Sequence, residues 1–170
     1  LIEKKDDTKD KKRPKELTCD VHHISVKGKA YFCLVGLHNG NPYEVFAGKH
    51  GNLDKKIKTG LISKAKKAYK CIFDDGDEIN PINMSCDEHE DALTRLVSIS
   101  LRHGVDITYI VEQLDKTTGE LTSFAKCISR SLKKYVEGKK VEGKKCDECG
   151  GELIFSEGCE KCPCGYSKCG

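Results

Sequence analysis

The last 25 residues of the chain hold six of its eleven cysteines, and their spacing constrains the fold more than any other feature. Two pairs with two intervening residues, Cys146 with Cys149 and Cys159 with Cys162, are separated by nine residues. Two intervening residues let both sulfurs of a pair face one metal, and two such turns supply the four thiolates of a tetrahedral zinc site. The spacing therefore predicts a zinc-ribbon-like module over residues 146–170, with these four cysteines as the metal ligands.

Two more cysteines, Cys164 and Cys169, lie at the end of this segment. Only one residue separates Cys162 from Cys164, a poor turn for a metal, so Cys159 is the favoured partner of Cys162. A dithiol at the end of a chain suits thiol–disulfide exchange, and the neighbouring Lys168 favours the thiolate that attacks. We therefore expect Cys164 and Cys169 to form a redox pair. The alternative is that one of them is a metal ligand and the other an idle thiol.

The remaining composition favours a cytoplasmic protein. The sequence contains no apolar run of the roughly 18 residues that span a bilayer, and its charged beginning lacks the apolar stretch of a signal peptide. A high cysteine count without a secretion signal points to a metal or redox site in a reducing compartment. The other five cysteines are expected to be small buried side chains: Cys19, Cys33, Cys71, Cys86 and Cys127. Because the sequence starts at Leu1, we expect a piece of a longer polypeptide or a processed product.

Ahead of the cysteines, the pattern predicts an α+β domain over residues 17–137, between a flexible charged linker (1–16) and a short basic tether (138–145). The first half carries strand formers and turn signals: a hairpin over 17–39, a strand at 43–46 and one or two strands within 61–73. Consecutive histidines at 22 and 23 fall in a predicted strand, so their rings should point to opposite faces and not share a metal. A small antiparallel sheet is therefore expected first.

The second half shows helical periodicity. Ser85 and Glu88 have the spacing of a capping box before a run that ends at Gly104. Asp106 and Ser123 are the expected N-caps of a second and a third helix. Strands followed by helices indicate the α+β class.

Zinc ribbons often bind nucleic acid, and the lysines within 55–70 and 139–145 could neutralise phosphates. Against this interpretation, the ribbon itself has nearly balanced charge, and Tyr166 is its only candidate stacking aromatic. The alternatives to a redox role are therefore a nucleic-acid-binding ribbon, which is less favoured, and a protein-interaction module in which zinc is structural.

In order along the chain, several stretches resemble the C-terminal region of the adenosylcobalamin-dependent, class II ribonucleotide reductases. These are Arg13-Pro14, Tyr31, and residues 40–48 (GNPYEVFAG), 92–104 (ALTRLVSISLRHG), 110–114 (IVEQL) and 157–169 (EGCEKCPCGYSKC). The chain departs from that family at 122–126, where TSFAK replaces a Thr-Ser-Cys-Pro-Asp signature. It also has only Pro163 where many members have two residues between the last two knuckle cysteines, which leaves the ligand set open among the six.

The resemblance implies a function. That family reduces ribonucleotides to deoxyribonucleotides with adenosylcobalamin, in a catalytic barrel that this chain does not contain and that binds the nucleotide substrate. The tail would then re-reduce the active-site disulfide through Cys164 and Cys169, and thioredoxin or glutaredoxin would restore them.

Overall fold

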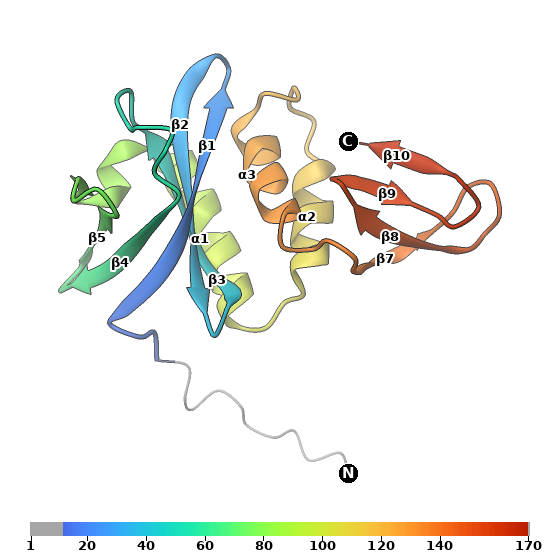
Figure 1. Ribbon diagram of the computed structural model, residues 1–170, viewed down its shortest axis with the longest axis horizontal. Helices are drawn as coiled ribbons and strands as arrows, with labels where there is room; N and C mark the ends of the chain where they lie inside the picture. The colour runs from blue at the N-terminus through green and yellow to red at the C-terminus, as the bar shows by residue number, and fades with distance from the viewer. Residues whose placement is uncertain (1–11, 170) are drawn as a thin grey trace, which may run out of the picture.

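The computed structural model describes residues 12–169 and confirms an α+β fold (Figure 1). Within these residues, a six-stranded antiparallel sheet precedes three α-helices, and a four-stranded antiparallel sheet ends the chain. The first sheet contains β1 (Glu16–Val26), β2 (Lys29–His38), β3 (Asn41–Lys49), β4 (Thr59–Ala65), β5 (Ala68–Phe73) and β6 (Glu78–Ile79). After the 3-10 helix η1 (Ile82–Ser85) come α1 (Glu88–Arg102), α2 (Ile107–Asp115) and α3 (Phe124–Lys133). The C-terminal sheet contains β7 (Lys140–Lys145), β8 (Glu152–Ser156), β9 (Cys159–Lys161) and β10 (Ser167–Cys169).

Two tight turns set the register of the large sheet, whose strand order is β3-β2-β1-β4-β5-β6. Lys27-Gly28 joins β1 to β2 and Asn39-Gly40 joins β2 to β3, and all four residues have positive φ, between 48° and 79°. Consecutive positive φ values match the twist of a two-residue hairpin, and asparagine and glycine tolerate them best. The predicted hairpin is therefore confirmed.

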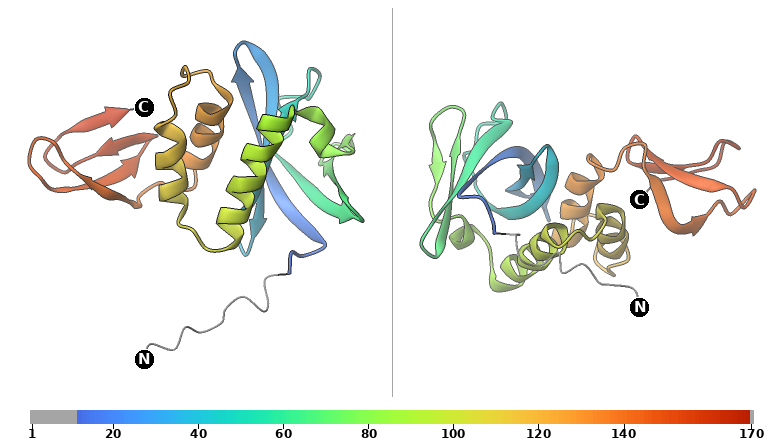
Figure 2. Two further views of the ribbon diagram at one scale, coloured as in Figure 1. Left: turned by 180° about the vertical axis from the view of Figure 1, so that it is seen from behind. Right: turned by 90° about the horizontal axis from the view of Figure 1, so that it is seen from below.

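Strand β2 is buried on both faces and separates two apolar cores. Phe32 and Leu34 belong to a cluster on one face, which Ile82 of η1 helps to close. Cys33 and Val35 point the other way, into the cluster that the helices cover. Figure 2 shows that the sheet is curved and that α1 lies along its convex face. The period-2 alternation of a strand explains how four consecutive residues serve two cores.

The N-termini of the helices agree only in part with the sequence. The capping box of α1 is Asp87 with Glu90, not Ser85 with Glu88, because Ser85 is taken up by η1. Asp106 caps α2 as expected, accepting from the backbone N–H of Thr108 at 2.9 Å. Ser123 occupies the N-cap position of α3, but its hydroxyl makes no capping hydrogen bond. The helices are thus where the periodicity placed them, with different capping chemistry.

A buried charge cluster lies where β3 meets α1. Glu44, with a side chain 1% exposed, accepts from Nε of Arg13 at 2.7 Å and from its Nη2 at 2.5 Å. Arg102 of α1 approaches the same carboxylate at 3.7 Å. Gly36 on β2 makes room for this side chain, since a Cβ there would lie 2.6 Å from Cγ of Glu44. Arg13 belongs to the segment predicted as a flexible linker; residues 1–11 of that segment lie outside the described residues.

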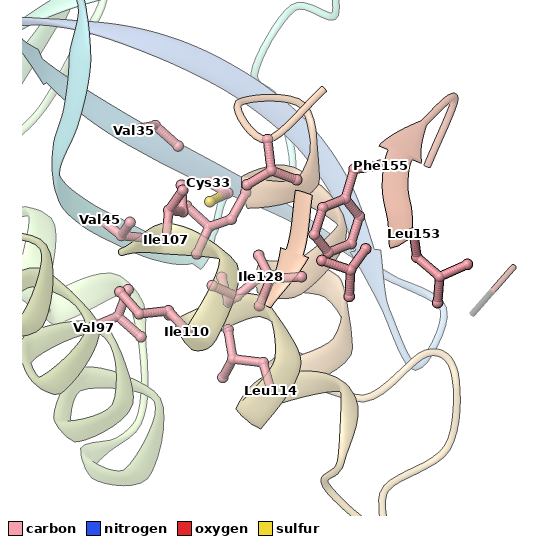
Figure 3. Close-up of a cluster of buried hydrophobic side chains, with 14 of the residues drawn as sticks. Cys33, Val35, Val45, Val97, Ile107, Ile110, Leu114, Ile128, Leu153 and Phe155 are labelled. Atoms are coloured by element: carbon pink, nitrogen blue, oxygen red, sulfur yellow. The ribbon is translucent and has the colours of Figure 1, made fainter. Parts of the chain in front are cut away.

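The C-terminal sheet packs against the helices instead of hanging from a tether. Leu153 and Phe155 of β8 and Val141 of β7 belong to the same apolar cluster as Ile128 of α3, and Figure 3 shows Phe155 among the helical side chains. Most of the segment predicted as a tether is strand β7, anchored by hydrogen bonds between Phe155 and the backbone of 138–139. Three apolar side chains are too few for a core of their own, so the sheet uses the neighbouring one.

Candidate metal centre and redox pair

Two loops of the C-terminal sheet carry four of the six tail cysteines, and the first loop joins β7 to β8. Here Cys146 N–H donates to the carbonyl of Gly151 at 2.9 Å, and Gly150 N–H donates back to Cys146 at 2.8 Å. Gly150 has a φ of 68°, which glycine adopts without a steric penalty. The turn directs the Cys149 sulfur inward, where it accepts from Gly151 N–H at 3.4 Å.

The second loop joins β9 to β10 and faces the first. Cys162 N–H donates to the carbonyl of Tyr166 at 2.9 Å, and Gly165 N–H donates to Cys162 at 3.0 Å. Gly165 has a φ of 102°, so this turn also depends on glycine. The Tyr166 hydroxyl donates to Asp147 of the first loop at 3.0 Å and ties the two loops together.

The two loops bring together the sulfurs of Cys146, Cys149, Cys162 and Cys164, all within 4.8 Å of one another. Cys146 lies 3.6 Å from Cys164, and Cys149 lies 3.5 Å from Cys162. A tetrahedral zinc site with Zn–S bonds of about 2.3 Å has sulfurs about 3.8 Å apart, so four thiolates at this spacing fit such an ion. A Cβ at Gly151 would lie 3.1 Å from the Cys149 sulfur, so a larger residue there would crowd that sulfur.

The cluster contains three of the four cysteines that the sequence predicts as metal ligands. Cys159 lies outside the cluster, and Cys164 takes its place. The predicted turn between Cys159 and Cys162 does not form, because residues 159–161 are strand β9. Cys162 begins the turn that follows β9, whereas Cys159 lies on the strand opposite Cys169, so these two sulfurs do not come together. The sequence signal for this arrangement is the single residue, Pro163, between Cys162 and Cys164.

Cys159 and Cys169 instead form a disulfide between β9 and β10. They are directly opposite in the antiparallel ladder, with Cα atoms 4.3 Å apart, close to the roughly 4.5 Å of a non-hydrogen-bonded pair. The expected pairing of Cys164 with Cys169 is therefore corrected at Cys164. Cys169 is exposed and Cys159 half-buried, so an external thiol can reach the bond.

Lys168 does not lie beside the disulfide. It is opposite Glu160 in the ladder, and strand alternation places both on the face away from Cys159 and Cys169. Both line a cavity of about 230 Å³ between this sheet and the helices, together with Lys133 and Asp115, which form an ion pair at 2.9 Å. The interpretation of Lys168 as an activator of Cys169 thus loses its geometric basis.

The thiols of the chain differ in their electrostatics. The pKa of Cys146 is lowered to about 7: burial acts to raise it, but the backbone N–H groups of Cys149 and Glu148 stabilise its thiolate. By contrast, burial raises the pKa of Cys33 to about 12. Of the five scattered cysteines, Cys19, Cys33, Cys71 and Cys127 are buried as expected, while Cys86 is half-buried. The tail thiols also differ from one another: the backbone N–H of Tyr166 favours the thiolate of Cys164, but the neighbouring Cys162 thiol and burial raise the pKa of Cys164 to about 12.

The two strand histidines have separate partners, as predicted. Nε2 of His22 lies 2.7 Å from the hydroxyl of Tyr135, and its Nδ1 lies 3.1 Å from Nζ of Lys134. Nε2 of His23 lies 2.8 Å from the carbonyl of Ile57. Burial, with Lys134 nearby, lowers the pKa of His22 to about 4. Both rings therefore serve the packing of β1.

Fold and site define an α+β domain that carries a C-terminal sheet with a four-cysteine cluster suited to a metal ion. The family model described as the NrdJ homologue C-terminal domain matches residues 17–137. Because the match covers more than half of the chain, the chain belongs to this family, which is related to the class II ribonucleotide reductases. No curated protein and no solved structure matches the chain. Among the helices of the described residues, none has the length and apolar character needed to cross a membrane.

Proposed function

We propose that this chain is the electron-delivering C-terminal part of an adenosylcobalamin-dependent ribonucleotide reductase, acting in the cytoplasm. The observation that carries the proposal is the division of the six tail cysteines into a four-sulfur cluster and a separate, accessible disulfide. Membership of a family related to these reductases supports the same proposal. A module with only a structural metal would have no need of the second pair.

In this proposal Cys159 and Cys169 take the role that the sequence assigned to Cys164 and Cys169. As a dithiol, the pair attacks the disulfide left in the active site of the catalytic barrel, which lies in the same or a separate chain. One tail thiolate forms a mixed disulfide, and the other resolves it. The tail then holds one S–S bond and the active site two thiols. Thioredoxin or glutaredoxin supplies two electrons and two protons to restore the tail.

Zinc is the ion that we propose for Cys146, Cys149, Cys162 and Cys164. Four thiolates with no open position are typical of a structural zinc site. The ion would hold the two loops together and so support the strands that carry the redox pair. Adenosylcobalamin would act in the barrel of the parent enzyme and not in this chain.

The test is turnover of the parent reductase with Cys159→Ser and Cys169→Ser variants. Each should lose repeated turnover with thioredoxin or glutaredoxin, while a pre-reduced variant still completes one turnover. A small dithiol that enters the active site directly should restore repeated turnover. The matched control is Cys86→Ser, a half-buried thiol outside the tail, which should leave turnover unchanged.

Normal turnover of both variants with the protein reductants would remove the redox role. The tail would then be a protein-interaction or nucleic-acid-binding module with a structural metal.

A further inference from the structure

The candidate metal centre and the disulfide are nested in the sequence. The bond between Cys159 and Cys169 has a sequence separation of 10, and Cys162 and Cys164 lie inside the loop that it closes. The loop therefore consists of β9, the second metal-binding turn and β10. The turn is therefore the covalent connection between the two strands that carry the redox sulfurs.

The redox cysteines lie on two short strands, and β10 is the less supported of the two. β9 and β10 have three residues each, and the side chains of Ser167, Lys168 and Cys169 are all exposed. Within the described residues, β10 pairs only with β9 and forms the edge of its sheet. β9 is supported on its other side by β8, but β10 buries no apolar side chain of its own. The turn at Cys162–Tyr166, with its two backbone hydrogen bonds, therefore contributes to holding β10 against β9.

The first loop fixes this turn from the other side. Cys146 and Cys149 belong to a separate hairpin, which packs on the main core through Leu153 and Phe155. A metal bound by all four thiolates would clamp the turn to that rigid base. The strands leaving the turn would then hold Cys159 and Cys169 opposite each other in both oxidation states.

We propose that metal binding at the four-cysteine cluster lowers the reduction potential of the Cys159–Cys169 pair. The metal would pre-organise the loop, so closing the disulfide would cost less conformational entropy. Reciprocally, the disulfide holds the second turn in its metal-binding shape, so the oxidised tail binds the metal more tightly by the same factor. A lower potential makes the dithiol a stronger electron donor. This inference rests on the proposed function for its biological purpose, but it concerns an equilibrium of the isolated chain.

The size of the effect follows from loop closure. Closing a loop of about 11 residues costs enough entropy to change an equilibrium constant by about 100-fold. Partial pre-organisation recovers part of this, so we expect the metal to favour the disulfide by about 10- to 100-fold. At about 30 mV per tenfold, this corresponds to about 30–60 mV.

The experiment compares the intact chain loaded with zinc with a variant in which Cys146, Cys149, Cys162 and Cys164 are all serine. In the variant, Cys159 and Cys169 are the only tail thiols, so no other tail disulfide can form. Both proteins are equilibrated with reduced and oxidised dithiothreitol. Each dithiothreitol that becomes a cyclic disulfide loses two electrons and two protons, and the Cys159–Cys169 bond gains them to become two thiols. Alkylation and mass spectrometry measure the reduced fraction, with Cys86→Ser in both proteins to silence the half-buried thiol.

The expected result is a potential that is about 30–60 mV more negative in the zinc-loaded chain. The second measurement needs no ligand variant: competition with a chelator should show tighter zinc binding by the oxidised than by the reduced chain, by the same factor. Equal potentials together with equal zinc affinities would overturn the coupling while leaving the proposed function intact. A chain that binds no zinc would overturn the coupling and the assignment of zinc to the four-cysteine cluster, but not the redox role of Cys159 and Cys169.

Discussion

Neutralising Glu44 should destabilise the α+β domain more than any surface charge change. Glu44→Gln keeps the shape of the side chain but removes the charge that two hydrogen bonds from Arg13 and the approach of Arg102 compensate. The side chain of Arg13 is only 5% exposed, so water cannot take over from the carboxylate. Leaving one partner of a buried pair without its counter-charge costs about 3–5 kcal/mol.

The assay is equilibrium unfolding in urea. With a slope of about 2 kcal/mol per molar urea, a loss of about 3 kcal/mol moves the midpoint down by about 1.5 M. The matched control is Arg95→Gln on α1. It removes one charge from an exposed pair, Arg95 with Asp91 at 2.7 Å, in which Arg95 is 61% exposed. Exposed i,i+4 pairs contribute about 0.3–0.5 kcal/mol, so this midpoint should barely move.

A loss below about 1 kcal/mol in Glu44→Gln would refute the reasoning, because that is the range of an exposed pair. A loss in Arg95→Gln as large as that in Glu44→Gln would do so as well. Arg13, Glu44 and Arg102 all lie in stretches that carry the resemblance to the reductases, and the ion cluster gives them a shared structural reason.

Three further predictions concern the tail and β1. Cys164→Ser should weaken zinc binding by about 100-fold or more, since apparent zinc energies of about 10–16 kcal/mol are shared by four thiolates, whereas Cys159→Ser should bind zinc as tightly as the reduced wild-type chain; competition with a chelator under reducing conditions distinguishes them. Phe155→Ala should cost about 3–5 kcal/mol in urea unfolding, because Phe155 is 4% exposed and joins the C-terminal sheet to the helices; a loss under 1 kcal/mol would show that the sheet packs loosely. The lowered pKa of His22, about 4 in the folded chain against about 6.5 unfolded, means that the unfolded chain binds more protons between these values. Stability should be full above about pH 6.5 and fall as the pH drops toward 4, and His22→Gln should flatten this part of the profile; an unchanged slope would contradict the burial argument.

Local sequence rules were enough to predict many of the turns and helix starts of the α+β domain. Asn39-Gly40 predicts its hairpin because only a few residue types accept positive φ, and Asp106 predicts the start of α2 because its side chain caps the nearest backbone N–H groups. Where two local solutions compete, the sequence does not decide between them. Ser85 with Glu88 and Asp87 with Glu90 have the same capping-box spacing, and the 3-10 turn before α1 selects the second.

The cysteine-rich tail shows most clearly what the sequence alone does not decide. By itself the sequence determined that the tail cysteines are suited to a metal and a redox pair, because residue type and crowding are local properties. Only the tertiary structure decided that Cys164 joins the cluster and Cys159 pairs with Cys169. That choice depends on β9 being a strand, which places Cys159 three residues before the turn that begins at Cys162, and on the β9–β10 register, which places Cys159 opposite Cys169. Register and strand formation come from pairing between distant residues and from packing on α2 and α3, and no local spacing rule contains them.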